Sequence, residues 1–166
     1  MNTTSTSPWW RQVLAAACDP GVETAKPRPR WLALPLREAQ SLAQLLARLY
    51  VAQVFFMSGL TKLRDWSITL ALFEDEYHVP LLPPELAAYM GTGGELLLPV
   101  LLVLGLGGRF AAAGLSVMNV VAVLSLAEVA PAALIGHQLW GSLLIGLLLW
   151  GPGRWSVDAL LAARRR

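Results

Sequence analysis

The stretch over residues 86–150 contains only three ionised side chains, Glu95, Arg109 and Glu128. A water-soluble domain has about 25% charged residues, because its surface must be solvated. The whole chain has 14% charged and 55% hydrophobic residues, whereas soluble domains have roughly 45–50% hydrophobic residues. The stretch therefore indicates a set of membrane-spanning helices and argues against an independent soluble enzyme.

Four segments of the chain are long and apolar enough to be transmembrane helices. Such a helix needs about 20 mostly apolar residues to cross a hydrocarbon core of roughly 30 Å. The segments cover residues 42–63, 86–106, 109–129 and 133–150. Gly107 and Gly108 separate the middle two, which predicts a tight hairpin of antiparallel helices. The expected fold class is all-α: a four-helix transmembrane bundle with short interfacial helices at both ends.

The predicted organisation has a membrane domain and two polar ends. Residues 1–41 form a cytoplasmic leader, with a short amphipathic helix over residues 9–17 and a Pro/Arg-rich linker. The four-span membrane domain covers residues 42–151, and an amphipathic cytoplasmic tail covers residues 152–166. The single cysteine, Cys18, allows neither an internal disulfide nor a cysteine metal site.

The distribution of basic residues predicts how the chain is oriented. Lys and Arg gather before the first span, at Arg109 between the middle spans, and in the C-terminal tail, whereas the connection over residues 64–85 is acidic. Short cytoplasmic loops have the excess of basic residues, so both termini are expected in the cytoplasm. The basic pI therefore reflects membrane topology. The lipid bilayer is the expected partner, and no nucleic-acid partner is expected.

A set of motifs follows in order along residues 47–158. They are Arg48 and FMSGLTKL at 56–63, VPLLPP at 79–84, ELLLP at 95–99 including Pro99, LGLGGRFAA at 104–112 including Arg109, and Gly151, Pro152 and Gly153 followed by Ser156 and Asp158. Together these motifs resemble the DoxX family of small four-helix membrane proteins. The resemblance implies a bundle in a bacterial-type inner membrane. One branch of that family is the small subunit of a thiosulfate:quinone oxidoreductase, and other members are accessory membrane subunits.

Glu95 and Lys62 are the first candidates for a functional site. Glu95 lies near the middle of the second predicted span, where a carboxylate must be protonated or paired. Lys62, near the outer end of the antiparallel first span, is its natural partner. The pair is either a structural bridge that fixes helix pairing or a proton or quinone site. A third interpretation is that Lys62 extends to the interface without contacting Glu95.

One face of the first predicted span combines Arg48, Ala52, Phe55, Gly59 and Lys62, which follow helical spacing. We expect this face to point into the bundle, with Gly59 allowing close approach of a neighbouring helix. Arg48 lies near the inner end of the span. Its long side chain is able to reach lipid phosphates there.

Four further residues are candidates for a quinone pocket. His137 starts the fourth span beside Trp140, and its imidazole can bond a quinone carbonyl or relay a proton. Gln53 and Asn119 lie in the middle of their spans and can form hydrogen bonds between helices. For all of them the alternative is a purely structural or interfacial role.

The connection after the first span combines acidic and apolar residues. The run over residues 74–78 offers carboxylate and imidazole ligands, but acidic runs are usually solvated, and no metal site is predicted. The apolar positions over residues 70–84 predict an amphipathic helix and an extended segment over the bundle, suited to a lid or a docking surface.

Three functions are consistent with these features. The first is an inner-membrane subunit of a quinone-linked redox complex, with quinone as the only expected cofactor and with a protein partner or a homo-oligomer completing it. The second is a non-enzymatic anchor or assembly protein, because the sequence has no complete catalytic constellation. The third is a small proton-coupled transporter, although no inverted repeat is evident. If the chain has an enzymatic role, we expect that role to be as a subunit of an oxidoreductase.

Overall fold

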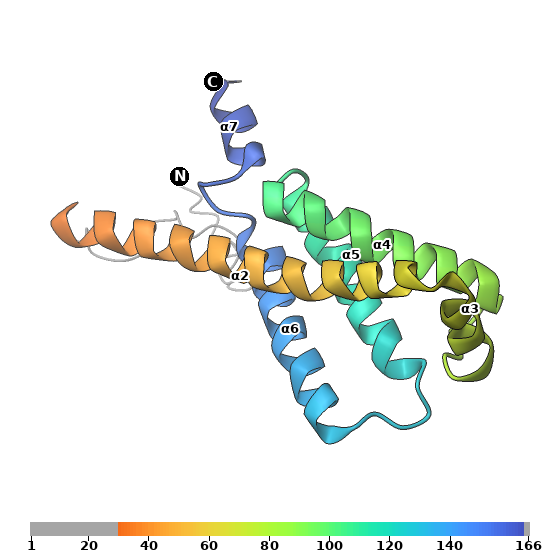
Figure 1. Cartoon of the computed structure of the whole chain (residues 1–166). Coiled ribbons are helices and arrows are strands. Elements are labelled where there is room, and N and C mark those ends of the chain that lie inside the picture. The colour runs from red at the N-terminus through yellow and green to blue at the C-terminus, as the bar shows by residue number, and fades with distance from the viewer. Residues whose placement is uncertain (1–29, 165–166) are drawn as a thin grey trace, which may run out of the picture. The chain divides into compact units, whose positions relative to one another are not determined.

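The computed structural model describes residues 30–164, and within this range all regular secondary structure is helical. The helices are α2 (Arg30–Arg64), α3 (Trp66–Asp75), α4 (Pro84–Leu104), α5 (Gly108–Leu124), α6 (Pro131–Trp150) and α7 (Val157–Arg164) (Figure 1). The predicted leader helix over residues 9–17 lies outside the described residues. The predicted all-α membrane fold is confirmed.

Prolines and glycines set the ends of the inner helices. Pro84 and Pro131 occupy the first turns of α4 and α6, where a missing N–H is harmless. Between α4 and α5, Gly105 and Gly107 have φ of +64° and +56°, a left-handed conformation that glycine adopts without steric penalty. The tight hairpin forms as expected, although its left-handed glycines are Gly105 and Gly107, and Gly108 already belongs to α5.

Two helix boundaries differ by more than two residues from those predicted. Helix α2 begins at Arg30, within the predicted leader, because residues 31–40 are mostly Leu, Ala, Arg, Glu and Gln, which favour helix. Helix α5 ends at Leu124, where Ser125 forms the C-cap, five residues before the predicted end of the span.

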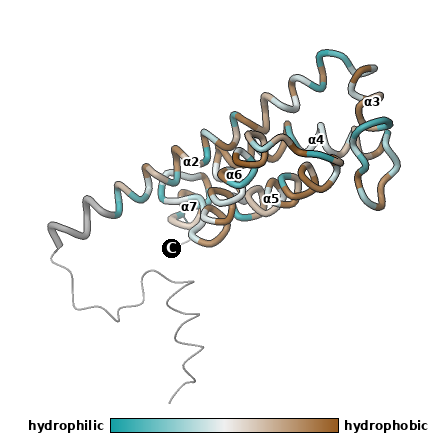
Figure 2. The backbone as a smooth tube through the Cα atoms, turned by 90° about the horizontal axis from the view of Figure 1, so that it is seen from below, coloured by the Kyte–Doolittle hydropathy of each residue, from teal (hydrophilic) through white to brown (hydrophobic). Residues whose placement is uncertain are grey.

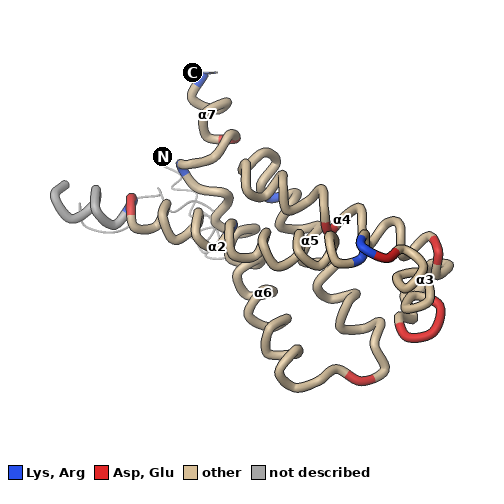
Figure 3. The backbone as a smooth tube through the Cα atoms, viewed as in Figure 1, with Lys and Arg blue, Asp and Glu red and all other residues tan. Residues whose placement is uncertain are grey.

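Within residues 30–164, three helices are long and apolar enough to cross a membrane: residues 37–64 of α2, α4 and α6. Helix α5 is apolar but has only 17 residues, and it is about 26 Å long at a rise of about 1.5 Å per residue. A slightly short helix is accommodated by local thinning of the bilayer. Figure 2 shows hydrophobic residues along these helices, and Figure 3 shows that α6 has no charge whereas acidic residues gather near α3.

The core of the unit that comprises residues 39–166 lies between four helices. Helix α5 packs against α4 and α6, and α3 packs against α4. Apolar side chains from α2, α4, α5 and α6 form the main cluster, which includes Val51, Phe55, Leu102, Leu115 and Leu144. Large hydrophobic side chains also cover the outer faces of all four helices, where lipid would solvate them.

Arg48 is buried at one end of this unit, with 2% of its surface exposed. Its guanidinium donates hydrogen bonds to the carbonyl oxygens of Val103 at 2.7 Å and Trp155 at 3.0 Å, and to that of Pro152. The possible reach of Arg48 to lipid phosphates was therefore a wrong interpretation. Three backbone carbonyls close to helix ends lack helical donors, and they hold the guanidinium inside the protein.

Asp158 completes the same end of the unit. Its two carboxylate oxygens accept hydrogen bonds from the backbone N–H groups of Gly107 and Gly108, both at 2.9 Å. These N–H groups lie at the start of α5, where an anion is favoured by the helix dipole. The Ser156 hydroxyl accepts from the N–H of Ala159 at 3.2 Å and so caps α7.

We predict that Arg48→Met lowers the free energy of unfolding by about 3 kcal/mol or more, because it leaves buried carbonyls without donors. Thermal and denaturant unfolding in detergent micelles measures the change. Arg109→Met is the matched control, since Arg109 is exposed and donates one bond, to the Leu149 carbonyl at 3.2 Å. Equal losses in both variants would contradict the role assigned to Arg48.

Candidate functional site

Lys62 and Glu95 form an ion pair between α2 and α4. The Nζ atom of Lys62 lies 2.6 Å from Oε2 and 2.7 Å from Oε1 of Glu95. The hydroxyl of Ser58, one turn before Lys62, accepts from Nζ at 3.0 Å and donates to Oε1 at 3.2 Å. The two charged side chains are 19% and 14% exposed. This geometry agrees with the two interpretations in which Lys62 pairs with Glu95, a structural bridge or a proton or quinone site. It does not agree with a Lys62 that extends to the interface without contacting Glu95.

The close approach of α2 and α4 brings these two side chains together. A Cβ atom at Gly59 would lie 3.0 Å from Cγ of Leu96 and 3.1 Å from Cβ of Glu95. A larger residue would therefore require Leu96 or Glu95 to shift by a few tenths of an ångström at the level of the ion pair. Pro99 is buried one turn after Glu95 and has no N–H to donate to the Glu95 carbonyl.

His137 is held by Asn119 across the hairpin of α5 and α6. The side-chain amide of Asn119 donates from Nδ2 to the His137 carbonyl at 2.9 Å, and its Oδ1 lies 2.9 Å from Nδ1 of the imidazole. Because Oδ1 only accepts, Nδ1 bears the ring hydrogen in the neutral imidazole. Trp140 packs edge-on against His137, with ring centroids 5.0 Å apart.

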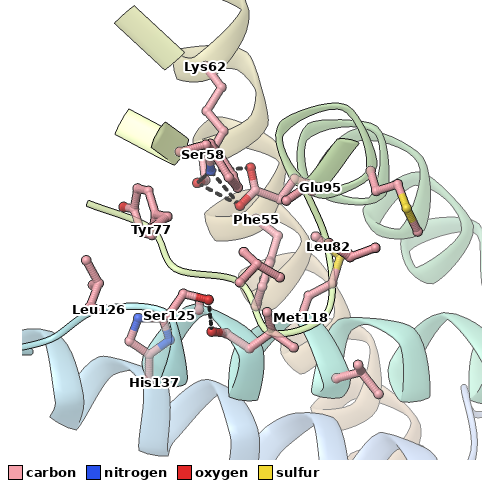
Figure 4. A pocket seen from close by; sticks show the side chains of 18 of the residues that line it. Phe55, Ser58, Lys62, Tyr77, Leu82, Glu95, Met118, Ser125, Leu126 and His137 are labelled. Carbon is pink, nitrogen blue, oxygen red and sulfur yellow. Dashed lines mark hydrogen bonds and ion pairs between the residues drawn. The ribbon is translucent and has the colours of Figure 1, made fainter. Parts of the chain in front are cut away.

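A cavity of about 460 Å³ lies between the ion pair and His137 (Figure 4). Its walls are mostly apolar, and they come from α2, α3, α4, α5, α6 and the segment after α3. The polar side chains at the walls are Ser58, Lys62, Tyr77, Glu95, Ser125, His137 and Trp140. A cavity of roughly 300–1,000 Å³ with few polar groups is typical of a small-molecule site.

The structure places four of the six candidate site residues at this cavity, and these are Lys62, Glu95, His137 and Trp140. Gln53 lies on the exposed face of α2, because it follows the buried Ala52 and is turned by about 100° from it. Asn119 does not line the cavity but contacts His137, which does.

The DoxX-like motif residues Arg109, Gly151, Pro152 and Gly153 lie at the other end of the unit, whereas Gly59 and Pro99 lie beside the ion pair. Arg109 is exposed, and Gly151 and Gly153 end α6 with φ of +85° and +83°. Pro152 between them contributes its carbonyl to Arg48 and packs closely on Gly108, where a Cβ atom would lie 2.6 Å from the Pro152 ring.

The segment that follows α2 contributes site residues that the sequence analysis did not assign. Asp65 caps α3 by accepting from the N–H of Ile68 at 3.1 Å. Phe73, Tyr77 and Leu82 then line the cavity. The N–H of His78 donates to the Ser125 carbonyl at 2.9 Å, which ties the segment to the end of α5. The predicted amphipathic character of this segment was the available signal, but it does not show which residues face the cavity.

We predict that Tyr77 makes the fold sensitive to alkaline pH. Burial, and to a smaller extent the carboxylates of Glu76 and Glu95, raise the pKa of the Tyr77 hydroxyl above its ordinary value. Above a pH of about 10 the unfolded chain loses this proton first, so stability falls as pH rises. Tyr77→Phe should flatten the decline of the unfolding temperature above that pH, measured in detergent.

The matched control is Tyr89→Phe, which removes a hydroxyl from an exposed residue of α4. It should keep the pH profile of the unmodified protein. A Tyr77→Phe profile identical to that of the unmodified protein would contradict the assignment.

A second prediction concerns the ion pair. Lys62→Met or Glu95→Leu alone should lower the free energy of unfolding by about 3 kcal/mol, because each leaves one partly buried charge unpaired. The double variant Lys62→Met/Glu95→Leu should recover most of that loss, and the coupling follows from a double-mutant cycle. Additive losses in the double variant would show that the two charges do not stabilise each other.

The described residues define a class of protein: an α-helical membrane protein with a mostly apolar cavity that contains an ion pair at one wall and a histidine at another. No group of three or more His, Cys, Asp or Glu residues in residues 30–164 is arranged to hold a metal ion.

The family model for DoxX matches residues 43–128, more than half of the 166 residues. The chain therefore belongs to the DoxX family, as the motifs predicted. The matched range contains both Lys62 and Glu95. No curated protein and no solved structure is detectably similar to the chain.

Proposed function

We propose that this protein binds a quinone-class molecule in the cavity and acts as a membrane subunit of a redox complex. The observation that supports this most is the combination of a mostly apolar cavity of about 460 Å³ with polar groups on separate walls. A quinone headgroup is a flat apolar ring with an oxygen on each of two opposite sides. A cavity of this volume can hold one such ring, and polar groups on separate walls can face the oxygen substituents at its two ends.

The polar residues have distinct parts in this proposal. Ser58, Lys62 and Glu95 form one hydrogen-bonding wall, and His137 forms another (Figure 4). A quinone supplies reversible two-electron, two-proton chemistry when it is bound. The protein would orient the ring between these walls, and Glu95 and His137 would hold or accept protons at its oxygens. The rings of Phe55 and Trp140, 6.3 Å apart, would exclude water beside it.

The position of the cavity suits a ligand that comes from the bilayer. Met90 on α4 and Val117 on α5 both line the cavity, and they are also 58% and 63% exposed. These faces are apolar, so in a membrane they would meet lipid rather than water. A lipid-soluble ligand would thus reach the site without leaving the hydrocarbon region.

The setting in the membrane forms part of the proposal. Arg109 donates to the Leu149 carbonyl, so the α4–α5 hairpin and the end of α6 lie at the same end of the bundle as the basic C-terminal tail. This supports an inner-membrane topology with both termini in the cytoplasm. The electrons would come from a partner protein with a redox cofactor. A second copy of this chain is the alternative partner.

A second candidate function is a non-enzymatic anchor or assembly protein. One observation favours it: every N–H of Lys62 is used within the protein, by Ser58 and both oxygens of Glu95. If the pair only holds helices together, the Lys62→Met/Glu95→Leu double variant keeps its cellular function. If the pair belongs to a ligand site, the stable double variant loses it.

Filling the cavity tests the proposed function. Ala122→Phe places a ring into the cavity wall on α5, and we expect at least tenfold weaker binding of a short-chain benzoquinone or naphthoquinone. Quenching of tryptophan fluorescence in lipid nanodiscs measures this binding, because Trp140 lines the cavity. Val120→Phe, on the exposed face of the same helix, is the matched control and should bind normally. Equal binding by both variants, or binding of neither the quinone nor its reduced quinol by the unmodified protein, would overturn the proposal.

A further inference from the structure

We propose that the cavity selects the reduced, hydroxyl-bearing quinol over the oxidised quinone. This inference rests on the proposed quinone site and adds the chemical form of the ligand. It follows from which polar atoms at the cavity already have a hydrogen-bond partner within the protein and which remain available to a ligand.

Lys62 has no hydrogen left for a ligand. An ammonium group has three N–H donors and no acceptor. The three donors are matched by Ser58 Oγ at 3.0 Å and by the two oxygens of Glu95 at 2.7 and 2.6 Å. The cation therefore cannot donate to a quinone carbonyl without breaking one of these short bonds.

Glu95 has acceptor capacity left. A carboxylate has about four lone-pair sites. Oxygen Oε1 accepts from Lys62 and from Ser58, whereas Oε2 accepts from Lys62 alone. The unmatched lone pair of Oε2 belongs to a side chain that lines the cavity. At this wall the protein offers an acceptor to the ligand.

His137 also offers an acceptor. Its Nδ1–H is directed to Oδ1 of Asn119, whose orientation is set by the bond from Nδ2 to the His137 carbonyl. The other ring nitrogen, Nε2, has a lone pair in this tautomer and no hydrogen-bond partner among the described residues. Asn119 is therefore a positioning residue, because it selects which nitrogen of His137 bears the hydrogen.

The other polar side chains at the cavity do not offer hydrogen-bond donors that would outweigh the acceptors of Glu95 and His137. The hydroxyl of Ser125 donates to the Val121 carbonyl at 2.7 Å, and that of Ser58 donates to Glu95. The indole N–H of Trp140 has no hydrogen-bond partner, but its nitrogen has almost no accessible surface, so this donor is not exposed to a ligand in the cavity. The Tyr77 hydroxyl can donate or accept, so it serves either form of the ligand.

A ligand that lies between two hydrogen-bond acceptors must supply two hydrogen-bond donors to satisfy both. A quinol has a hydroxyl group at each end of the ring and can donate to Glu95 and to His137. A quinone has only carbonyl oxygens, which would face lone pairs at both walls and leave these groups unmatched. Sites built around a ligand hydroxyl discriminate strongly against analogues that lack it.

The experiment compares binding of menadiol and menadione to the full chain in lipid nanodiscs under anaerobic conditions. We expect the dissociation constant of menadiol to be at least tenfold lower. Binding of neither compound would overturn the proposed quinone site itself. Equal binding, or tighter binding of menadione, would leave that site intact and overturn the selectivity inferred here.

Two variants locate the source of the selectivity. His137→Gln introduces an amide that can donate or accept, so menadiol should lose most of its advantage while menadione still binds. Asn119→Leu frees the imidazole to adopt either tautomer and should have a similar, smaller effect. Ser142→Ala removes an exposed hydroxyl bonded within α6 and is the control. Unchanged selectivity in His137→Gln would exclude His137 as the acceptor.

Discussion

Arg48 holds one end of the bundle together, and the positions of the other elements depend on it. Its guanidinium connects α2 to the end of α4 and to the segment after α6 through three backbone carbonyls. Water is absent from a bilayer core, so polar groups there must be matched within the protein. These bonds tie α2 to the end of α4, and so help to set which residues of the two helices lie side by side further along.

The same requirement explains the polar groups at the cavity. Lys62 and Glu95 neutralise each other with help from Ser58, and Asn119 satisfies one side of His137. These internal bonds leave acceptor atoms rather than donors at the cavity walls. In the proposed site the hydrogen bonds that stabilise the bundle also set the ligand preference, so the structural and the functional interpretations of the buried pair are compatible.

Much of the fold was predictable from the sequence, because the length of the apolar segments and the glycines and prolines at helix ends are local signals. The partnership of Lys62 with Glu95 was predictable as well, since an isolated carboxylate in a span demands a partner. The partners of Arg48 were not, because they are backbone carbonyls up to 107 residues away that no side-chain pattern marks. The exposure of Gln53 and the contact of Asn119 with His137 depend on helix rotation, which weak amphipathic patterns leave open.

Native mass spectrometry of the protein extracted gently from its own membrane tests the central claim most directly, with the bound lipid-soluble molecules identified. The account predicts one quinone-class molecule retained per chain, released when the cavity is filled by substitution. Retention of phospholipid alone, with no quinone or quinol, would contradict it and favour the anchor or assembly function.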